Sequence, residues 1–143
     1  MLIKQISVFI ENRPGRLSDI ISALAAGGID IRALSLADTT NFGILRLIVN
    51  DPARAAELLR SQRFTVSVSE VLAVEIPDEP GGLASTLAIL NGAGISVEYA
   101  YAFITRKAKG AYVILRVENN NIAVDTLRAG GVKLVGADEL YAL

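Results

Sequence analysis

Two short stretches contain the residue types that could bind a small molecule. Residues 11–17 read ENRPGRL and residues 78–83 read DEPGGL, so Pro-Gly-x-Leu recurs sixty-six positions further along the chain. Each stretch follows a strand-like apolar run and precedes an apolar stripe with helical spacing. Proline ends a strand because it cannot donate a ladder hydrogen bond, and glycine lets the backbone approach a ligand closely. The next helix starts with backbone N–H groups that have no partner inside it.

Free amides at the positive end of a helix favour a small carboxylate. An α-amino acid adds an ammonium group, which needs oxygen atoms nearby. Asn12 and Asp30 could supply them for the first stretch, and Asp78 and Ser96 for the second. We therefore predict amide donors at residues 15–17 and 81–83. A Pro-Gly turn is also a common passage from strand to helix, so the pattern alone leaves a plain turn open.

Composition narrows the function classes. The 143 residues include 14 Lys and Arg against 15 Asp and Glu, so no basic field would attract nucleic acid. No apolar stretch approaches the roughly 20 residues of a membrane helix. The first residues alternate and soon meet charge, which argues against a signal peptide and leaves the cytoplasm as the default location.

Cysteine and histidine are both absent. Without them the chain has neither thiolate metal ligands nor the usual base at neutral pH. It also has no Walker loop and no G-x-G-x-x-G after a strand. We therefore predict no enzyme, no catalytic residue, no metal site and no cofactor.

The duplicated stretch belongs to a longer repeat, with one unit over residues 1–70 and a second over residues 71–143. Hydrophobic periodicity predicts strand, helix, strand, strand, helix, strand in each unit. The first unit has strands near 5–10, 29–36, 43–50 and 64–71 and helices near 17–24 and 51–62; the second has strands at 71–77, 95–104 and 110–119, helices near 83–90 and 121–131, and a closing segment after residue 131.

A βαββαβ unit most simply forms a four-stranded antiparallel sheet with both helices on one face. The predicted fold class is thus α+β, with two ferredoxin-like units. No Pro/Gly/Ser-rich linker separates them, so we expect the units to pack side by side.

The first unit resembles the ACT domain, a small regulatory module that binds amino acids. The resemblance rests on a strand that ends in ENRPGRL, followed by an apolar helix and then by AGGIDIRALS. PDEPGGL and NGAGISVEYAYA fit the same pattern in the second unit. The whole chain thus resembles a stand-alone tandem ACT protein. The resemblance implies that each loop meets the second strand of a neighbouring ACT unit and holds a free amino acid in the gap.

Carried over to this chain, Asn12 matches the loop asparagine of the family, and Pro14, Gly15 and Leu17 match its turn. Asp30 stands where serine-sensing members often have asparagine, while Ile10 replaces a histidine found in some of them. In the second unit Asp78 replaces the loop asparagine, so either the two sites differ or only one of them is occupied. The candidate ligand-binding residues are Asn12, Arg13, Pro14, Gly15, Arg16, Leu17, Asp30, Ile31, Asp78, Glu79, Gly81, Gly82, Leu83, Ser96 and Val97.

Two functions remain open. The first is a regulatory sensor that binds a free amino acid and acts on a partner enzyme of amino-acid metabolism. The second is a structural module that binds no ligand and docks on a partner. An acylphosphatase-type enzyme would need a glycine-rich anion cradle, and an RNA-binding module would need basic and aromatic strands; neither pattern is present. The high apolar content and the sheet edges predict a homodimer.

Overall fold

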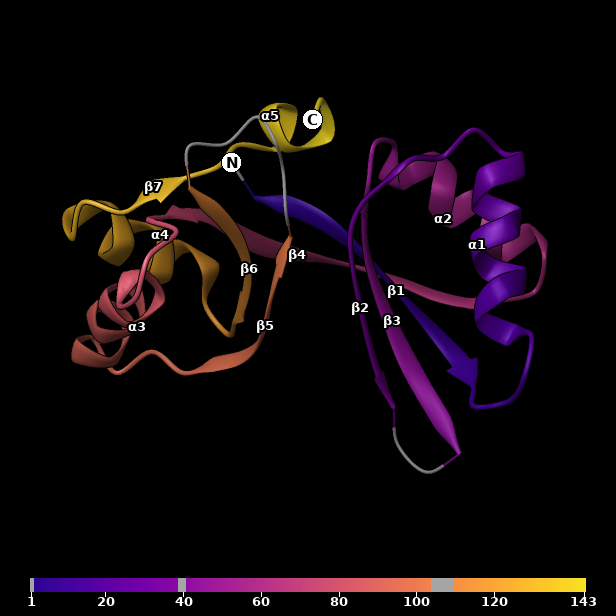
Figure 1. The fold of residues 1–143 in the computed structure, drawn as a ribbon, viewed down its shortest axis with the longest axis horizontal. Coiled ribbons are helices and arrows are strands. Elements are labelled where there is room, and N and C mark those ends of the chain that lie inside the picture. The colour runs from indigo at the N-terminus through magenta and orange to yellow at the C-terminus, as the bar shows by residue number, and fades with distance from the viewer. Residues whose placement is uncertain (1, 39–40, 104–109) are drawn as a thin grey trace. The chain divides into compact units, whose positions relative to one another are not determined.

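The computed structural model describes residues 2–38, 41–103 and 110–143 (Figure 1). Its elements are, in chain order, β1 (Ile3–Glu11), α1 (Arg16–Ala26), β2 (Ile31–Asp38), β3 (Phe42–Val49), α2 (Pro52–Ser61), β4 (Thr65–Ile76), α3 (Gly82–Gly92), β5 (Val97–Phe103), β6 (Ala111–Val117), α4 (Asn120–Ala129), β7 (Lys133–Leu134) and α5 (Ala137–Tyr141). They form two compact units, which we call the N-terminal unit (Lys4–Ser69) and the C-terminal unit (Glu70–Tyr141).

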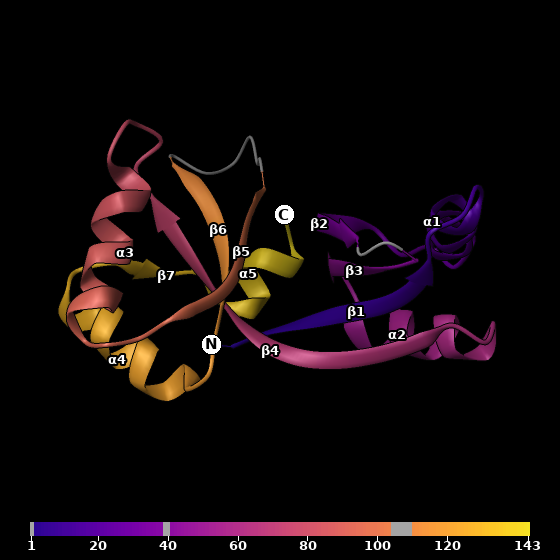
Figure 2. The ribbon, with the colours of Figure 1, turned by 90° about the horizontal axis from the view of Figure 1, so that it is seen from below.

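The N-terminal unit has the strand order β2-β3-β1-β4, and the C-terminal unit has the order β7-β4-β6-β5. Hairpin partners pair antiparallel, with Leu36 opposite Leu45 in one unit and Ala100 opposite Leu115 in the other. Two helices cover one face of each sheet: α1 and α2 in the first, α3 and α4 in the second (Figures 1 and 2). The predicted α+β class with two βαββαβ units is confirmed.

The core of the N-terminal unit lies between its sheet and its helices. Alternate residues of β1 point toward the helices because successive side chains of a strand face opposite sides. The buried cluster contains Ile6, Val8, Ile10, Ile20, Ala23, Leu24, Ile29, Leu45, Leu47, Val49, Ala55, Ala56, Leu59 and Phe64. The C-terminal unit repeats this arrangement with Leu72, Val74, Ile76, Leu90, Val113, Leu115, Val117, Ala123, Val124 and Leu127.

The second helix of each unit starts at a side-chain cap. The carboxylate of Asp51 accepts a hydrogen bond from the Arg54 N–H at 3.2 Å, and Pro52 takes the first helical position, as predicted. The side chain of Asn119 accepts in the same way from the Ile122 N–H at 3.1 Å. These caps satisfy N–H groups that the first turn of a helix leaves without partners.

Three details differ from the sequence-based prediction. The strands expected at 64–71 and 71–77 form one strand, β4, because nothing in TVSVSEVLAVEI breaks the extended chain. The closing strand of the second unit, β7, is only two residues long. The short helix α5 was not predicted; its five residues bury Leu140.

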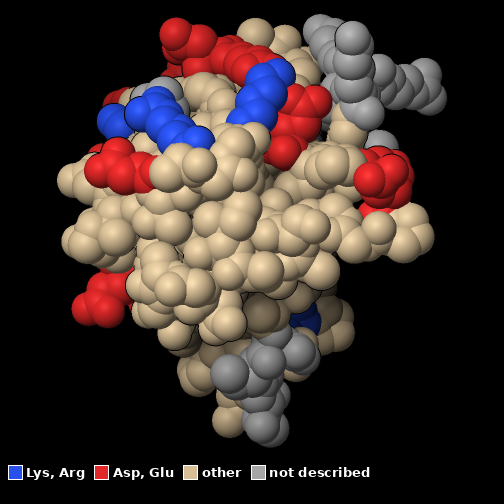
Figure 3. All heavy atoms as spheres, turned by 90° about the vertical axis from the view of Figure 1, so that its left-hand side faces the viewer, with Lys and Arg blue, Asp and Glu red and all other residues tan. Residues whose placement is uncertain are grey.

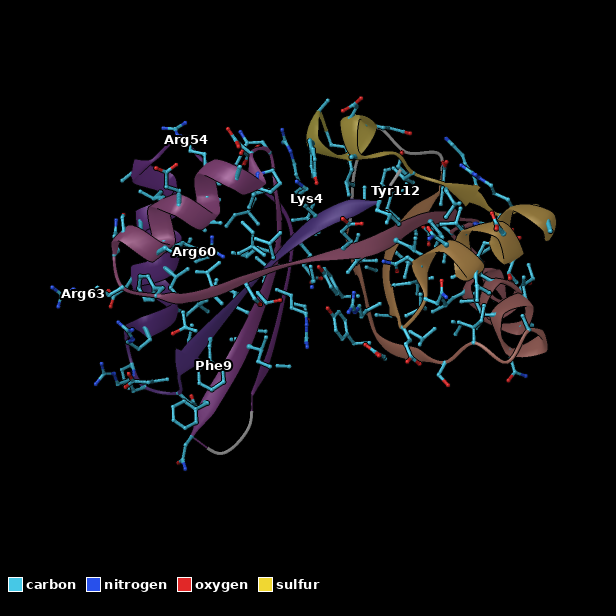
Figure 4. The ribbon with its side chains drawn as sticks, turned by 180° about the vertical axis from the view of Figure 1, so that it is seen from behind. Lys4, Phe9, Arg54, Arg60, Arg63 and Tyr112 are labelled. Carbon is cyan, nitrogen blue, oxygen red and sulfur yellow. The ribbon has the colours of Figure 1, made fainter. Side chains whose placement is uncertain are left out.

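A polar cluster ties the end of the C-terminal unit to its sheet. The hydroxyl of Tyr112, on β6, donates a 3.0 Å hydrogen bond to Glu139 of α5 (Figure 4). The ammonium of Lys133 lies 2.7 Å from Glu75 and 3.9 Å from Glu139. Burial, followed by the bond to Glu139, raises the pKa of Tyr112, and the hydrogen bond to Glu75 raises the pKa of Lys133.

The cluster predicts a loss of stability at alkaline pH. Both groups hold their protons more tightly in the folded chain than in the unfolded chain, so the unfolded chain releases them first as pH rises above the ordinary tyrosine value of 10.0. The free energy of unfolding should therefore fall above about pH 10. Urea denaturation between pH 8 and pH 11 measures this free energy. In the Tyr112→Phe variant it should fall less steeply with pH than in the wild type. Parallel curves for the variant and the wild type would contradict the assignment.

Two glycines of α3 provide a second prediction. A Cβ at Gly82 would overlap the backbone carbonyl of Pro77, whereas a Cβ at Gly92 would meet nothing within 4 Å. Gly82→Ala should therefore destabilise the chain by about 1–3 kcal/mol, because backbone must shift. Gly92→Ala, the matched control on the same helix, should change stability by no more than about 1 kcal/mol. Equal urea midpoints for the two variants would contradict this prediction, because they would show that the loop before α3 shifts at little cost in free energy.

Candidate functional site: the glycine loops before α1 and α3

The first loop joins β1 to α1 through Pro14 and Gly15. Gly15 has φ +87° and ψ −17°, the left-handed conformation that residues with a Cβ rarely adopt. The chain therefore turns from strand into helix within a few residues. The Asn12 N–H donates to the carbonyl of Asn41 at 2.9 Å, which ties the loop to the residue just before β3.

Three backbone amides of this loop remain available. No residue that the structure describes accepts a hydrogen bond from the N–H of Gly15, Leu17 or Ser18. No side chain caps α1, in contrast to α2. The Arg16 N–H donates to the Arg13 carbonyl at 3.4 Å, so the available set differs by one residue from the predicted set 15–17.

The second loop has the same backbone form before α3. Gly81 has φ +89° and ψ −10°, and no side chain caps the helix. The Gly82 N–H donates to the Glu79 carbonyl at 3.1 Å, while the N–H groups of Gly81, Leu83 and Ala84 have no acceptor in the described parts of the chain. Each loop thus presents three backbone donors at the positive end of a helix, an arrangement that suits a carboxylate.

A cavity lies beside each loop. The cavity of the first loop has a volume of about 310 Å³, and its lining includes three predicted residues, Asn12, Arg13 and Leu17. Its other walls are Ile10, Glu11, Leu36 and Gly43. The larger cavity of the second loop, about 560 Å³, is lined by the predicted residues Glu79, Gly81 and Gly82, together with Glu75, Ile76, Pro77, Pro80, Ser85, Thr86, Ile89, Gly110, Gly130, Gly131, Val132 and Lys133.

Several of these walls were missed by sequence reasoning. Leu36 and Gly43 reach the first cavity only because β2 and β3 pair as a hairpin next to the end of β1. A Cβ at Gly43 would lie 3.3 Å from the carbonyl oxygen of Ala37 and 3.5 Å from the side chains of Ile10 and Leu36, so any larger residue here would pack directly against two walls of the cavity. Gly131 lines the second cavity from the turn after α4, and Lys133 lines it from β7. Pairing signals in the sequence could have suggested Gly43 but not Lys133.

Five predicted loop residues do not line the cavity beside their loop: Pro14, Gly15, Arg16, Asp78 and Leu83. The guanidinium of Arg16 lies 4.9 Å from the ring centre of Phe64 and 3.8 Å from Asp19, and Arg16 is not among the residues lining the first cavity. Its Nε is buried without a hydrogen-bond partner in the described residues. Leu83 is 40% exposed on α3 and does not line the second cavity.

The predicted strand residues lie at the opposite end of each unit from its loop. Glu11 pairs with Phe42 at one end of β3, whereas Ile31 pairs with Val49 at the other. Seven residue steps at roughly 3.3 Å each separate these ends by about 23 Å. The C-terminal unit repeats the separation, with Ile76 opposite Ala111 and Val97 opposite Val117. One unit alone therefore does not bring its loop and the start of its second strand to the same ligand.

The strand starts themselves differ between the units. The carboxylate of Asp30 pairs with Arg32 at 2.5 Å, and the Asp30 N–H donates to the Asn50 side chain at 2.9 Å. Ser96 instead lines a cavity of about 300 Å³ with Ala93, Gly94, Ile95, Glu98, Glu118, Asn119 and Ile122. In the described residues no cluster of acidic side chains has the arrangement of a metal site. None of the described helices is long and apolar enough to cross a membrane.

Comparisons with known proteins agree with this architecture. A family model described as an ACT domain pair matches residues 1–143. Protein BT0572 from Bacteroides thetaiotaomicron has a crystal structure similar to this chain, with 37% identity, a TM-score of 0.93 and coverage of 100% of this chain and 98% of that one. No curated protein matches.

Regulatory subunits of aspartate kinase share the fold at lower identity. The ligand-free subunit from Thermus thermophilus matches with a TM-score of 0.66 and 16% identity over 90% of this chain and 93% of its own. The subunit from Thermus flavus matches with a TM-score of 0.65 and 17% identity, over 90% of this chain and 90% of its own. ACT domains are regulatory and typically bind amino acids, rather than being catalytic themselves. The match over the full length shows that this chain belongs to the ACT domain pair family.

Proposed function

We propose that this protein is a sensor of a free amino acid, which it binds at the glycine loops to regulate a partner. The observation that carries the proposal is the set of uncapped amides, Gly15, Leu17 and Ser18 in the first loop and Gly81, Leu83 and Ala84 in the second. α2 and α4 of the same chain are capped by side chains, so the uncapped starts of α1 and α3 are not a general property of its helices.

In the proposed mode, the amides of a loop hold the carboxylate of the amino acid. The ammonium group binds to polar groups near Asn12 and at the start of the second strand, Asp30 or Ser96. The separation of about 23 Å along β3 means that these strand residues have to come from another ACT unit. We propose that a second copy of the chain provides it, so that ligand binding and homodimerisation are coupled.

The regulated partner that we propose is an enzyme of amino-acid metabolism, in the cytoplasm. The regulatory character of the ACT family supports this role. An amino acid that binds two copies at once could change the surface they present to such an enzyme, because binding favours the state in which both halves of the site are together.

A second candidate function is a docking module that binds no amino acid. α3 carries no charged side chain, and its Leu83 and Leu87 are exposed, as is Ile122 of α4. Figure 3 shows a broad uncharged area on this side of the C-terminal unit, with charged side chains along its upper edge and sides. Such an area favours contact with another protein.

Thermal unfolding in the presence of each of the twenty amino acids tests the proposed function. A ligand that binds only the folded chain stabilises it by about 2.7 kcal/mol at a hundredfold excess over Kd, which raises the Tm measurably. Valine at both Gly15 and Gly81 should remove the shift, because a branched side chain would cover the amides. Gly28→Val is the matched control: Gly28 has φ +72°, an added Cβ would meet only the Arg54 side chain at 3.9 Å, and Gly28 lines neither loop cavity, so it introduces similar backbone strain outside the proposed sites. If no amino acid at millimolar concentration raises the Tm of the wild type, the docking module is the better assignment.

Sedimentation velocity tests the coupling to self-association. We expect a dimer of the 15.2 kDa chain, strengthened by the amino acid that gives the largest thermal shift. The reason is that the proposed site is incomplete in one unit. A monomer at all concentrations, with and without that amino acid, would rule out a site shared between copies.

A further inference from the structure

The two loops share one backbone form but carry different charges. Gly15 and Gly81 differ by 2° in φ and 7° in ψ. At the two positions that precede Pro-Gly, however, Asn12 corresponds to Asp78 and Arg13 corresponds to Glu79. A neutral and a positive residue are thus replaced by two negative ones at the same places on the same turn.

The charges of the first loop are compensated locally. Arg13 lies 3.2 Å from Glu11, and Arg16 lies 3.8 Å from Asp19. Residues 11–19 therefore carry two positive and two negative side chains, with no net charge near the free amides. The side chain of Asn12 makes no hydrogen bond to the described residues and lines the cavity, where it can accept from an ammonium group.

The second loop carries an uncompensated negative charge. Asp78 and Glu79 are exposed and form no ion pair within the part of the chain that the structure describes. Lys133 lines the same cavity, but its ammonium is already paired with Glu75 at 2.7 Å and lies 3.9 Å from Glu139. Glu79 lines this cavity and Asp78 is its neighbour in the chain, so the loop places uncompensated negative charge beside the amides that an incoming carboxylate would have to reach.

We infer that only the first loop binds the amino acid, and that Asp78 and Glu79 exclude its carboxylate from the second. This inference rests on the proposed function. Like charges near a helix N-terminus act against an anion there, and at an exposed surface each contributes a modest amount that salt screens. Together the two residues should weaken binding of an amino acid at the second loop by about tenfold or more. One amino acid binds per chain, although the turn is present twice.

Exchange of the loop charges tests this inference. The second loop receives the charges of the first in Asp78→Asn/Glu79→Arg, and the first receives those of the second in Asn12→Asp/Arg13→Glu. All four side chains are exposed, so both variants should fold. The control Glu57→Arg/Asp125→Asn alters the total charge as much as the first exchange, at exposed positions of α2 and α4 outside both loops.

Equilibrium dialysis gives the readout although the amino acid is unidentified. Each protein is dialysed against a concentration series of the twenty L-amino acids as a mixture, and bound amino acids are counted per chain by chromatography. The wild type and the control should reach a first plateau at one amino acid per chain. Asp78→Asn/Glu79→Arg should reach two, and Asn12→Asp/Arg13→Glu should bind none in the same range.

The remaining outcomes separate the two levels of the proposal. A wild type that takes up two amino acids in a single step, or an Asp78→Asn/Glu79→Arg variant that stays at one, would overturn the inference while leaving the sensor function intact. A wild type that binds no amino acid would overturn both.

Discussion

The left-handed backbone of Gly15 and Gly81 is the constraint on which the candidate sites depend. With φ near +87° and +89°, each glycine takes the N-cap position of the helix that follows, where it has no side chain to accept an N–H. The other two long helices start at Asp51 and Asn119, whose side chains each accept one N–H of the first turn, from Arg54 and Ile122. The same chain therefore caps α2 and α4 with side chains and leaves α1 and α3 without such caps beside the two loop cavities.

Antiparallel pairing determines how much of a site one unit can contain. The loop after β1 lies at the start of β3, while the residues that follow α1 lie at its far end. An amino acid has its carboxylate and ammonium groups on a single carbon, so it cannot bridge that length. In the proposed mode each ACT unit thus carries two separate half-sites, and self-association is a requirement of binding rather than an addition to it.

Duplication has preserved the backbone of the loops and not their side chains. The turn depends on glycine and proline, since other residues are strained at positive φ. The exposed positions 12, 13, 78 and 79 contribute little to the fold, so their charges could diverge without loss of stability. Arg16 and its counterpart Gly82 have diverged for a different reason. Arg16 packs on Phe64, whereas Gly82 is buried where a Cβ would overlap the carbonyl of Pro77.

The sequence by itself determined the element order, the fold class and the two Pro-Gly turns, because alternation, helical stripes and glycine at positive φ are local properties. It also indicated the cap at Asp51. Only the tertiary structure decided that Leu36 and Gly43 line the first cavity, that Lys133 reaches the second, and that Arg16 packs on Phe64. These depend on strand register and on packing between residues far apart in the chain; of them, only Gly43 has a signal in the sequence, through the hairpin pairing of its strands. The short helix α5 was missed for the same reason, since burial of Leu140 holds it in place.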